Sequence, residues 1–207
     1  RVKITRLAIY PIKSCAGVAV RTWKLGKRGL VNDRHWMLVD ANGTFISQRE
    51  QPRLALVQPQ YSDDFQTLLV SAPGLPDQQA LKVDRTRPPP GAHVRIKLWD
   101  DEMMAREESA ECHAWFQKYL CLPGVRLVRI DPEHARTMDA KHAKSTTING
   151  AMAFPDSSPF LVLSKQSIEQ LADKLPHERK RCADIRRFRP NIVVDGCFAP
   201  HEEDHWH

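Results

Sequence analysis

Apolar and polar positions alternate with a period of two in short stretches of the first half of the chain. The alternation is clean at 94–98, and 2–10 shows it with a more apolar end. A strand with one buried face needs this period because successive side chains point to opposite faces. Further strands are predicted from β-branched and aromatic runs at 18–23, 37–39, 44–46, 54–57 and 67–70. The first half therefore predicts a β-barrel or sandwich of short strands.

Turn and loop residues separate these runs. Asn42-Gly43 predicts a type I′ hairpin turn, because both central residues of that turn adopt positive φ, which Asn and Gly tolerate. The stretch 72–91 is rich in Pro and Gly and predicts a long exposed connection. Residues 131–158 have weak periodicity and predict a mobile loop that could act as a lid over a site.

Two stretches have the spacing of amphipathic helices. The second follows Ser164, a good helix cap, and Pro176 closes it. Its apolar face carries Ile168, Leu171 and Leu175. The first follows Ser109, and we interpret its apolar stripe as core packing, formed by Cys112, Trp115, Phe116, Tyr119 and Leu120.

The second half adds three short apolar runs, at 125–130, 160–163 and 192–194. The last of these, Ile192-Val193-Val194, is β-branched throughout and favours a strand that is covered on both faces. The pattern as a whole predicts an α+β fold that is mainly β, with an N-terminal β-barrel-like domain followed by a second β-rich part.

Composition narrows the class of protein. The chain has 207 residues, of which 42% are hydrophobic and 27% charged, as in ordinary globular proteins. No apolar run approaches the roughly 18 residues of a membrane span, and the N-terminus opens into a strand-like alternation, so neither a membrane protein nor a signal peptide is predicted. Five scattered cysteines favour neither a disulfide framework nor a paired zinc site, and we expect a cytoplasmic location.

The net charge of +6 favours anionic partners. Nucleic acid, phosphate-bearing cofactors and acidic metabolites all remain open on charge alone. Basic residues concentrate at 177–191, a segment that contains six basic and two acidic residues. They are not interleaved with aromatic residues as an RNA-stacking surface would require, so nucleic acid is not the favoured partner.

Cations stand beside hydroxyl or amide groups in several turns that border strands. Side by side, such groups could hold a phosphate through charge-assisted hydrogen bonds. The alternative is that they lie on different faces of the protein, each hydrated, and spacing alone does not decide between the two. The candidates are Lys13 with Ser14, Arg34 with Asp33, Arg189 with Asn191, and Ser157 with Ser158.

Zinc binding and sulfur transfer by a cysteine have little support in the sequence. Glu203, His205 and His207 match no zinc-ligand spacing, so no metal site is predicted from them. Cys15, beside Lys13, is the one candidate for a thiol that carries sulfur as a persulfide, a role that needs an exposed thiol of low pKa. Cys197, beside a glycine, is interpreted as a small buried side chain.

Several of these stretches carry a family resemblance. The segments 10–17 (YPIKSCAG), 29–36 (GLVNDRHW) and 47–54 (SQREQPRL) resemble the N-terminal β-barrel domain of MOSC proteins. The segments 154–160, 187–191 and 203–206 resemble the start of the MOSC domain itself. The chain is thus similar to bacterial YcbX-like proteins and to the mitochondrial amidoxime-reducing component. We assign residues 1–125 to the N-terminal barrel, 126–144 to a connecting loop and 145–207 to a partial MOSC domain.

The resemblance implies a function. It implies a molybdenum cofactor, a pterin dithiolene with a terminal phosphate, and the reduction of small N-hydroxylated compounds. It also implies an electron-donor protein or fused redox domain, and a family-level association with pyridoxal phosphate. No catalytic residue is assigned. The family's cofactor contacts correspond here to Lys13, Ser14, Arg34, Ser157, Ser158, Arg189 and Asn191.

One departure from the family pattern bears on this expectation. The family's molybdenum-ligating cysteine belongs to a Cys-x-Arg-Cys stretch beyond the segment 203–206, and that stretch is not among the 207 residues. We therefore expect a C-terminally truncated relative, with an open strand edge and exposed apolar surface around 192–194. The alternatives are a non-catalytic cofactor-binding or sulfur-carrier module, and a general anion or nucleic-acid binder that uses 179–189.

Overall fold

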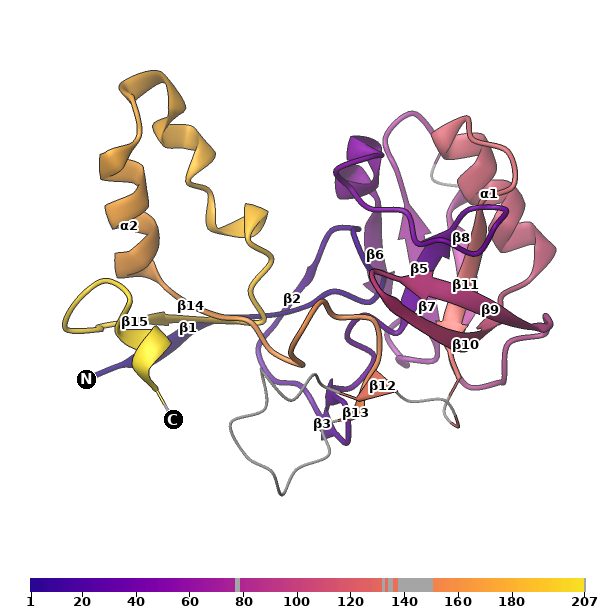
Figure 1. The fold of residues 1–207 in the computed structure, drawn as a ribbon, viewed down its shortest axis with the longest axis horizontal. Coiled ribbons are helices and arrows are strands. Elements are labelled where there is room, and N and C mark those ends of the chain that lie inside the picture. Colours follow the sequence, from indigo (N-terminus) through magenta and orange to yellow (C-terminus); the bar gives the residue numbers. More distant parts are fainter. Residues whose placement is uncertain (77–78, 132, 134–135, 138–150, 207) are drawn as a thin grey trace.

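The structure is a computed structural model that describes residues 1–206 except 77–78, 132, 134–135 and 138–150. Strands dominate it, in agreement with the predicted fold class. Figure 1 shows two bodies: a larger one built around α1 (Ala110–Leu120), and a smaller one in which α2 (Lys165–Lys174) stands against a sheet that contains both terminal regions. None of the helices in the described ranges has the length and apolar character needed to cross a bilayer.

The larger body contains an antiparallel sheet in the spatial order β5-β11-β10-β9. These strands are β5 (Trp36–Val39), β9 (His93–Leu98), β10 (Asp101–Glu107) and β11 (Arg126–Ile130). β11 lies within the predicted connecting loop, where it pairs with β5 and β10. The predicted domain boundaries stay predictions.

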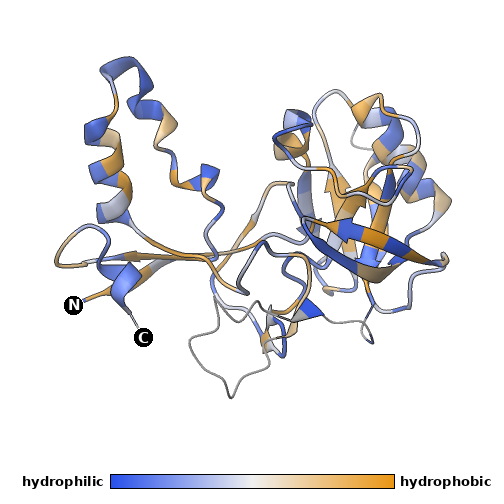
Figure 2. Ribbon diagram, in the orientation of Figure 1, coloured by the Kyte–Doolittle hydropathy of each residue, from blue (hydrophilic) through white to orange (hydrophobic). Residues whose placement is uncertain are grey.

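A three-stranded sheet, β6-β7-β8, and α1 complete the larger body. The strands are β6 (Gln58–Tyr61), β7 (Thr67–Ser71) and β8 (Leu81–Asp84). The helix predicted after Ser109 is confirmed as α1. The Ser109 side chain caps it by accepting a hydrogen bond from the backbone N–H of Cys112. Every residue of its predicted stripe is buried, in one core with Trp36, Leu38, Leu68 and Val83. Figure 2 shows hydrophobic residues concentrated in the strands beneath α1.

Two local predictions are wrong in this body. Residues 54–57 are not a strand, because a 3-10 helix, η1, spans Pro52–Leu56, and proline suits the first turn of a helix. The stretch 72–91 is not only a connection, because it contains β8, whose Leu81 and Val83 are buried. β10 was not predicted because its sequence, DEMMARE, lacks the usual strand composition, and pairing with strands on both sides stabilises it.

The turn at Asn42-Gly43 also differs from its prediction. Of this pair only Gly43 has a positive φ, +85°, whereas a type I′ turn needs positive φ at both residues. The backbone N–H of Gly43 donates to the carbonyl of Asp40 at 3.1 Å. The Asp40 carboxylate also accepts from the N–H groups of Asn42 and Thr44, both at 2.9 Å. The Asp40 side chain thus stabilises a three-residue turn that ends in a left-handed glycine.

The smaller body is the sheet β14-β15-β1-β2 with α2. Its strands are β1 (Lys3–Ile9), β2 (Val18–Val20), β14 (Val162–Ser164) and β15 (Ile192–Asp195). β15 lies between β14, its parallel partner, and β1, its antiparallel partner. Figure 1 shows α2 connecting β14 to the segment that returns to β15. The Ser164 side chain caps α2, as predicted.

The expected open edge at 192–194 is wrong. β15 is an internal strand, and Val193 and Val194 are buried. Exposed apolar surface does lie next to this strand at Ile4, the β1 partner of Val194. Other exposed apolar side chains of this body include Val2, Phe160, Leu161, Leu171, Phe188 and Phe198.

The described residues also form two short hairpins: β3 (Leu25–Gly26) with β4 (Gly29–Leu30), and β12 (Arg136–Thr137) with β13 (Ala151–Met152). Two 3-10 helices, η3 (His177–Cys182) and η4 (Ile185–Arg187), lie between α2 and β15. The second hairpin falls within the predicted lid at 131–158. Of that segment, 132, 134–135 and 138–150 lie outside the described residues, so the lid stays a prediction.

Candidate functional site

A cavity of about 260 Å³ forms where the loop after β1, the turn before β5 and the segments before β14 and β15 meet. The candidate residues line this one cavity, so they do not lie on different faces of the protein, the alternative that their spacing in the sequence left open. Their role toward a cofactor stays a prediction. The predicted residues among its lining are Lys13, Ser14, Arg34, Ser157, Ser158, Arg189 and Asn191.

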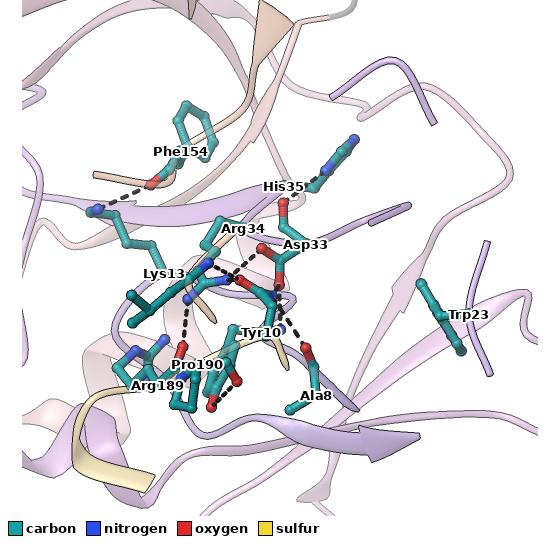
Figure 3. A network of polar contacts seen from close by, with 12 residues as sticks. Ala8, Tyr10, Lys13, Trp23, Asp33, Arg34, His35, Phe154, Arg189 and Pro190 are labelled. Carbon is teal, nitrogen blue, oxygen red and sulfur yellow. Dashed lines mark hydrogen bonds and ion pairs between the residues drawn. The ribbon is translucent and has the colours of Figure 1, made fainter. Parts of the chain in front are cut away.

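Lys13 is a buried cation, 7% exposed, in the loop that follows β1. A backbone hydrogen bond from its N–H to the carbonyl of Trp36, at 2.8 Å, holds that loop against β5. Its ammonium donates to the carbonyl of Phe154 at 2.9 Å and to Oδ1 of Asp156 at 2.6 Å (Figure 3 shows the first contact). Burial lowers the pKa of Lys13 to about 8, although the Asp156 carboxylate acts in the opposite direction.

Arg34 joins two loops that are far apart in the sequence. Its Nη1 donates to Oδ2 of Asp33 at 2.5 Å and to Oδ1 of Asn191 at 2.8 Å. Its Nη2 donates to the backbone carbonyl of Arg189 at 3.0 Å (Figure 3). Its side chain is 11% exposed, so Arg34 both borders the cavity and fixes the turn before β5 against the segment before β15.

Asn191 and Asp33 form the buried polar support of the site. The Asn191 side-chain amide donates to Oδ1 of Asp33 at 3.0 Å and to the carbonyl of Ala8 at 3.1 Å. Its carbonyl oxygen accepts from Arg34 and from the N–H of Leu161. These contacts use the full hydrogen-bonding capacity of the amide. Asn191 therefore holds the loops around the cavity together.

Of the buried cations Lys13, Arg34 and Arg189, Arg189 has the fewest polar partners. One Nη donates to the backbone carbonyl of Cys15, and none of the ion pairs found among the described residues includes it. Burial lowers the pKa of Arg189 to about 10, and the neighbouring charge of Arg34 adds to that effect. Both arginines also lie against the ring of Tyr10. A cation whose pKa is lowered in this way would be stabilised by an anion in the cavity.

The backbone at three of these positions is left-handed. Ser14, Arg34 and Arg189 have φ values of +69°, +47° and +59°. Such values are uncommon for residues other than glycine and cost on the order of 1–2 kcal/mol each. Hydrogen bonds with distant segments hold Arg34 and Arg189 in place. Strain of this kind clusters at functional sites, which supports the cavity as the site.

The remaining lining was not predicted as part of the site. The Nε1 of Trp99, just after β9, donates to Oδ1 of Asp156 at 3.0 Å. Phe45 packs edge-on against Trp99 with ring centroids 4.5 Å apart, and the guanidinium carbon of Arg49 lies 5.4 Å from the indole centroid. Asp156 adjoins the predicted Ser157-Ser158 pair, a signal that could have found it. Trp99 and Phe45 carry no comparable signal, because aromatic residues at strand ends usually belong to the core.

Cys15 and Cys197 do not line the cavity. Cys15 is fully buried, and burial raises its pKa to about 12, so it lacks the exposed, acidic thiol that a persulfide carrier needs. Cys197 is a small buried side chain, as predicted. In the parts of the chain that the structure describes, no group of three His, Cys, Asp or Glu side chains could hold a metal ion.

Comparisons with known proteins agree with the resemblance in the sequence. The family profile of the MOSC N-terminal beta barrel domain matches residues 1–123, and that of the MOSC domain matches residues 149–207. Mouse mitochondrial amidoxime-reducing component 1 is 32% identical over 208 residues, and bovine mitochondrial amidoxime reducing component 2 is 34% identical over 207. Each alignment covers 98% of this chain, and 58% and 59% of the respective relative.

A bovine molybdenum cofactor sulfurase is 30% identical over 217 residues, which are 98% of this chain and 24% of the sulfurase. The chain thus spans less than two thirds of the length of these curated relatives. The expected resemblance is confirmed by two family profiles in the predicted order, and the chain belongs to the MOSC family, joining a MOSC N-terminal beta barrel domain to MOSC domain residues.

Proposed function

We propose that this chain binds the molybdenum cofactor and that the complete protein reduces small N-hydroxylated compounds. Two relatives support this by name, since one class is called amidoxime-reducing and the other a molybdenum cofactor sulfurase. The observation that carries the proposal is the pair of cations at the cavity. Arg34 and Arg189 border the same space, and Arg189 takes part in no ion pair of the described chain.

The donor set suits the phosphate-bearing pterin that the family resemblance implies. Two guanidinium groups and an ammonium offer charge-assisted hydrogen bonds, which are roughly twice as strong as neutral ones. Arg189, Lys13 and the hydroxyl groups of Ser14, Ser157 and Ser158 would hold the anionic group, while Asn191 and Asp33 keep the loops in place. None of the cysteines in the described ranges lines the cavity, so these residues supply orientation and charge rather than a thiolate ligand.

When bound, the molybdenum cofactor would supply two-electron transfer and oxygen removal. Reduction of an N–OH group to N–H releases water and consumes two electrons and two protons. We therefore also propose an electron-donor protein or fused redox domain as a partner. The chain's own part is to bind the cofactor's anionic end at Arg189 and Lys13 and to hold the substrate at the exposed side of the cavity.

The test is the molybdenum and pterin content of the purified protein, by elemental analysis and by fluorescence of the oxidised pterin. We expect both, in equal amounts, and expect Arg189→Ala to lose them. Arg186→Ala is the matched control, because Arg186 is 73% exposed and already pairs with Asp184. The complete protein, loaded with the cofactor, should reduce benzamidoxime when a chemical electron donor is present. Nucleic acid bound in place of the cofactor, with steep salt dependence, would overturn the proposal.

A further inference from the structure

The cavity that contains the cations also has an aromatic wall. Phe45, Trp99, Phe160 and Phe188 all line it. Trp99, Phe160 and Phe188 are 38%, 36% and 40% exposed, so part of each residue is accessible to a ligand. Aromatic surface of this kind, beside a few placed polar groups, is typical of pockets for small organic ligands. The cavity can therefore hold a molecule with a flat apolar body as well as an anion.

Asp156 is the one carboxylate among the lining residues, and its side chain is 66% exposed. Oδ1 accepts hydrogen bonds from both Lys13, at 2.6 Å, and Trp99, at 3.0 Å. Oδ2 accepts no hydrogen bond from any described residue. Two donors thus fix the direction of the carboxylate and leave its second oxygen available.

The backbone that carries Asp156 is fixed as well. Arg136 donates to the carbonyl of Pro155 at 2.7 Å and to that of Asp156 at 2.9 Å. The same guanidinium donates to Oδ2 of Asp101, at the start of β10, at 2.5 Å. The segment 155–156 is therefore tied to the β9–β10 hairpin, which also carries Trp99. An acceptor held on both sides in this way loses little freedom when it binds a ligand.

Asp156 is ionised at neutral pH. Burial acts to raise its pKa, but the charge of Lys13 and the hydrogen bonds from Lys13 and Trp99 outweigh this, and the pKa lies below the usual value. Oδ2 is therefore a charged acceptor, which suits an N–H donor. It would repel an anionic group placed in the same position.

We propose that Asp156 determines substrate specificity: its Oδ2 accepts a hydrogen bond from an NH2 group beside the N–O bond of the substrate. The apolar body of the substrate then lies against Trp99, Phe160 and Phe188. This inference rests on the proposed function, and it assigns to one residue the selection of amidoxime-type compounds over oximes that lack the NH2 group. An analogue that lacks the NH2 group cannot form this hydrogen bond to a charged acceptor, so it should bind more weakly.

Benzamidoxime and benzaldoxime are the probes, because they share the phenyl ring and the N–OH group and differ in the NH2 group. Their dissociation constants are measured by calorimetry with the whole chain, as purified and after cofactor loading. We expect a preference for benzamidoxime of roughly 10- to 100-fold, the effect of one hydrogen bond to a charged group. Asp156→Ala should remove the preference, and Asp156→Asn, which has the same shape, should reduce it.

Asp173→Ala is the matched control, because Asp173 is also exposed and has one lysine partner, Lys180, at 3.3 Å. It should leave the preference unchanged, and thermal melting of each variant checks that it folds. A preference that survives in folded Asp156→Asn and Asp156→Ala, equal affinities in the unmodified chain, or no binding of either probe would each overturn the inference.

The two proposals can fail separately. A cofactor-loaded protein that reduces both probes equally well would keep the proposed function and reject the role of Asp156. A chain without molybdenum or pterin, whose preference still depends on Asp156, would keep the specificity role and reject the reductase.

Discussion

The guanidinium groups of Arg34 and Arg189 flank one tyrosine: each Cζ lies 4.5 Å from the centroid of the Tyr10 ring. Arg34 also donates a hydrogen bond to the backbone carbonyl of Arg189 at 3.0 Å. The ring and the carbonyl thus keep two like charges beside the same cavity, 155 positions apart in the sequence. An aromatic face attracts both cations, but neither contact neutralises the charge of Arg189.

An anion should stabilise the folded chain through this pair. We expect inorganic phosphate to raise the melting temperature of the unmodified protein, because a ligand that binds only the folded state adds about 2.7 kcal/mol at 100 times its Kd. Arg189→Ala should abolish most of that shift, and Arg186→Ala should preserve it. An equal shift in all three proteins, measured by calorimetry over a phosphate series, would show that phosphate binds elsewhere.

The lowered pKa of Lys13 determines how the free energy of unfolding should change with pH. Its pKa is about 8 in the folded chain and 10.5 in the reference state, so between these values the unfolded chain binds more protons. The contribution of Lys13 to the free energy of unfolding should therefore rise from pH 8 to pH 10.5. The measurement is the difference between the unmodified chain and Lys13→Met in urea unfolding across that range. Parallel curves for the two proteins would contradict the lowered pKa.

Glu203 ties the last 3-10 helix, η5 (Glu202–His205), to the start of α2. Its Oε1 accepts from the N–H of Ser164 at 2.8 Å and from the hydroxyl of Ser167 at 2.7 Å. Burial acts to raise its pKa, but these hydrogen bonds outweigh it, and the pKa lies below 4.5. Glu203→Gln should cost roughly 1–3 kcal/mol at pH 7.

That cost should disappear on acidification. Since the folded chain holds the charged form more strongly, the stability from Glu203 is present above pH 4.5 and is lost as the pH falls through the folded pKa. Glu169→Gln, on the exposed side of α2, serves as the control in the same unfolding series. A constant difference between Glu203→Gln and the unmodified chain down to pH 2 would be inconsistent with this assignment.

The internal position of β15 can be tested by truncating one side chain. Val193→Ala should lower the free energy of unfolding by about 2 kcal/mol, since Val193 is 2% exposed and its methyl groups fill the core. Phe198→Ala should change it by less than about 0.5 kcal/mol, because Phe198 is fully exposed. Similar small effects of both substitutions on the urea midpoint would indicate an open edge at β15 instead.

Thiol labelling separates the cysteines by burial. Cys121 is exposed, so iodoacetamide should modify it within minutes in the native chain at pH 8. Cys15 should react only after denaturation, because it is fully buried and its pKa is raised to about 12. Peptide mass spectrometry reads both sites. Native labelling of Cys15 at a rate similar to that of Cys121 would reopen the sulfur-carrier alternative.

Local pattern was sufficient for the elements whose stability is local. The stripe that ends at Leu120 predicted α1, and Ser109 and Ser164 cap α1 and α2 as their spacing indicates. β10 and β8 escaped prediction because pairing and burial, rather than composition, stabilise them. η1 escaped because Pro52 starts a helical turn in a run that otherwise has strand-forming residues.

The cations, hydroxyls and amide of the site could be predicted from the sequence, because turn chemistry and charge are properties of neighbouring residues. Their common cavity with Asp156 and Trp99, and the left-handed backbone of Ser14, Arg34 and Arg189, could not. Contacts such as Arg34 with Asn191, or Lys13 with Asp156, join segments more than 140 positions apart. No local periodicity encodes such distances, and the packing of β1 against β15 establishes them.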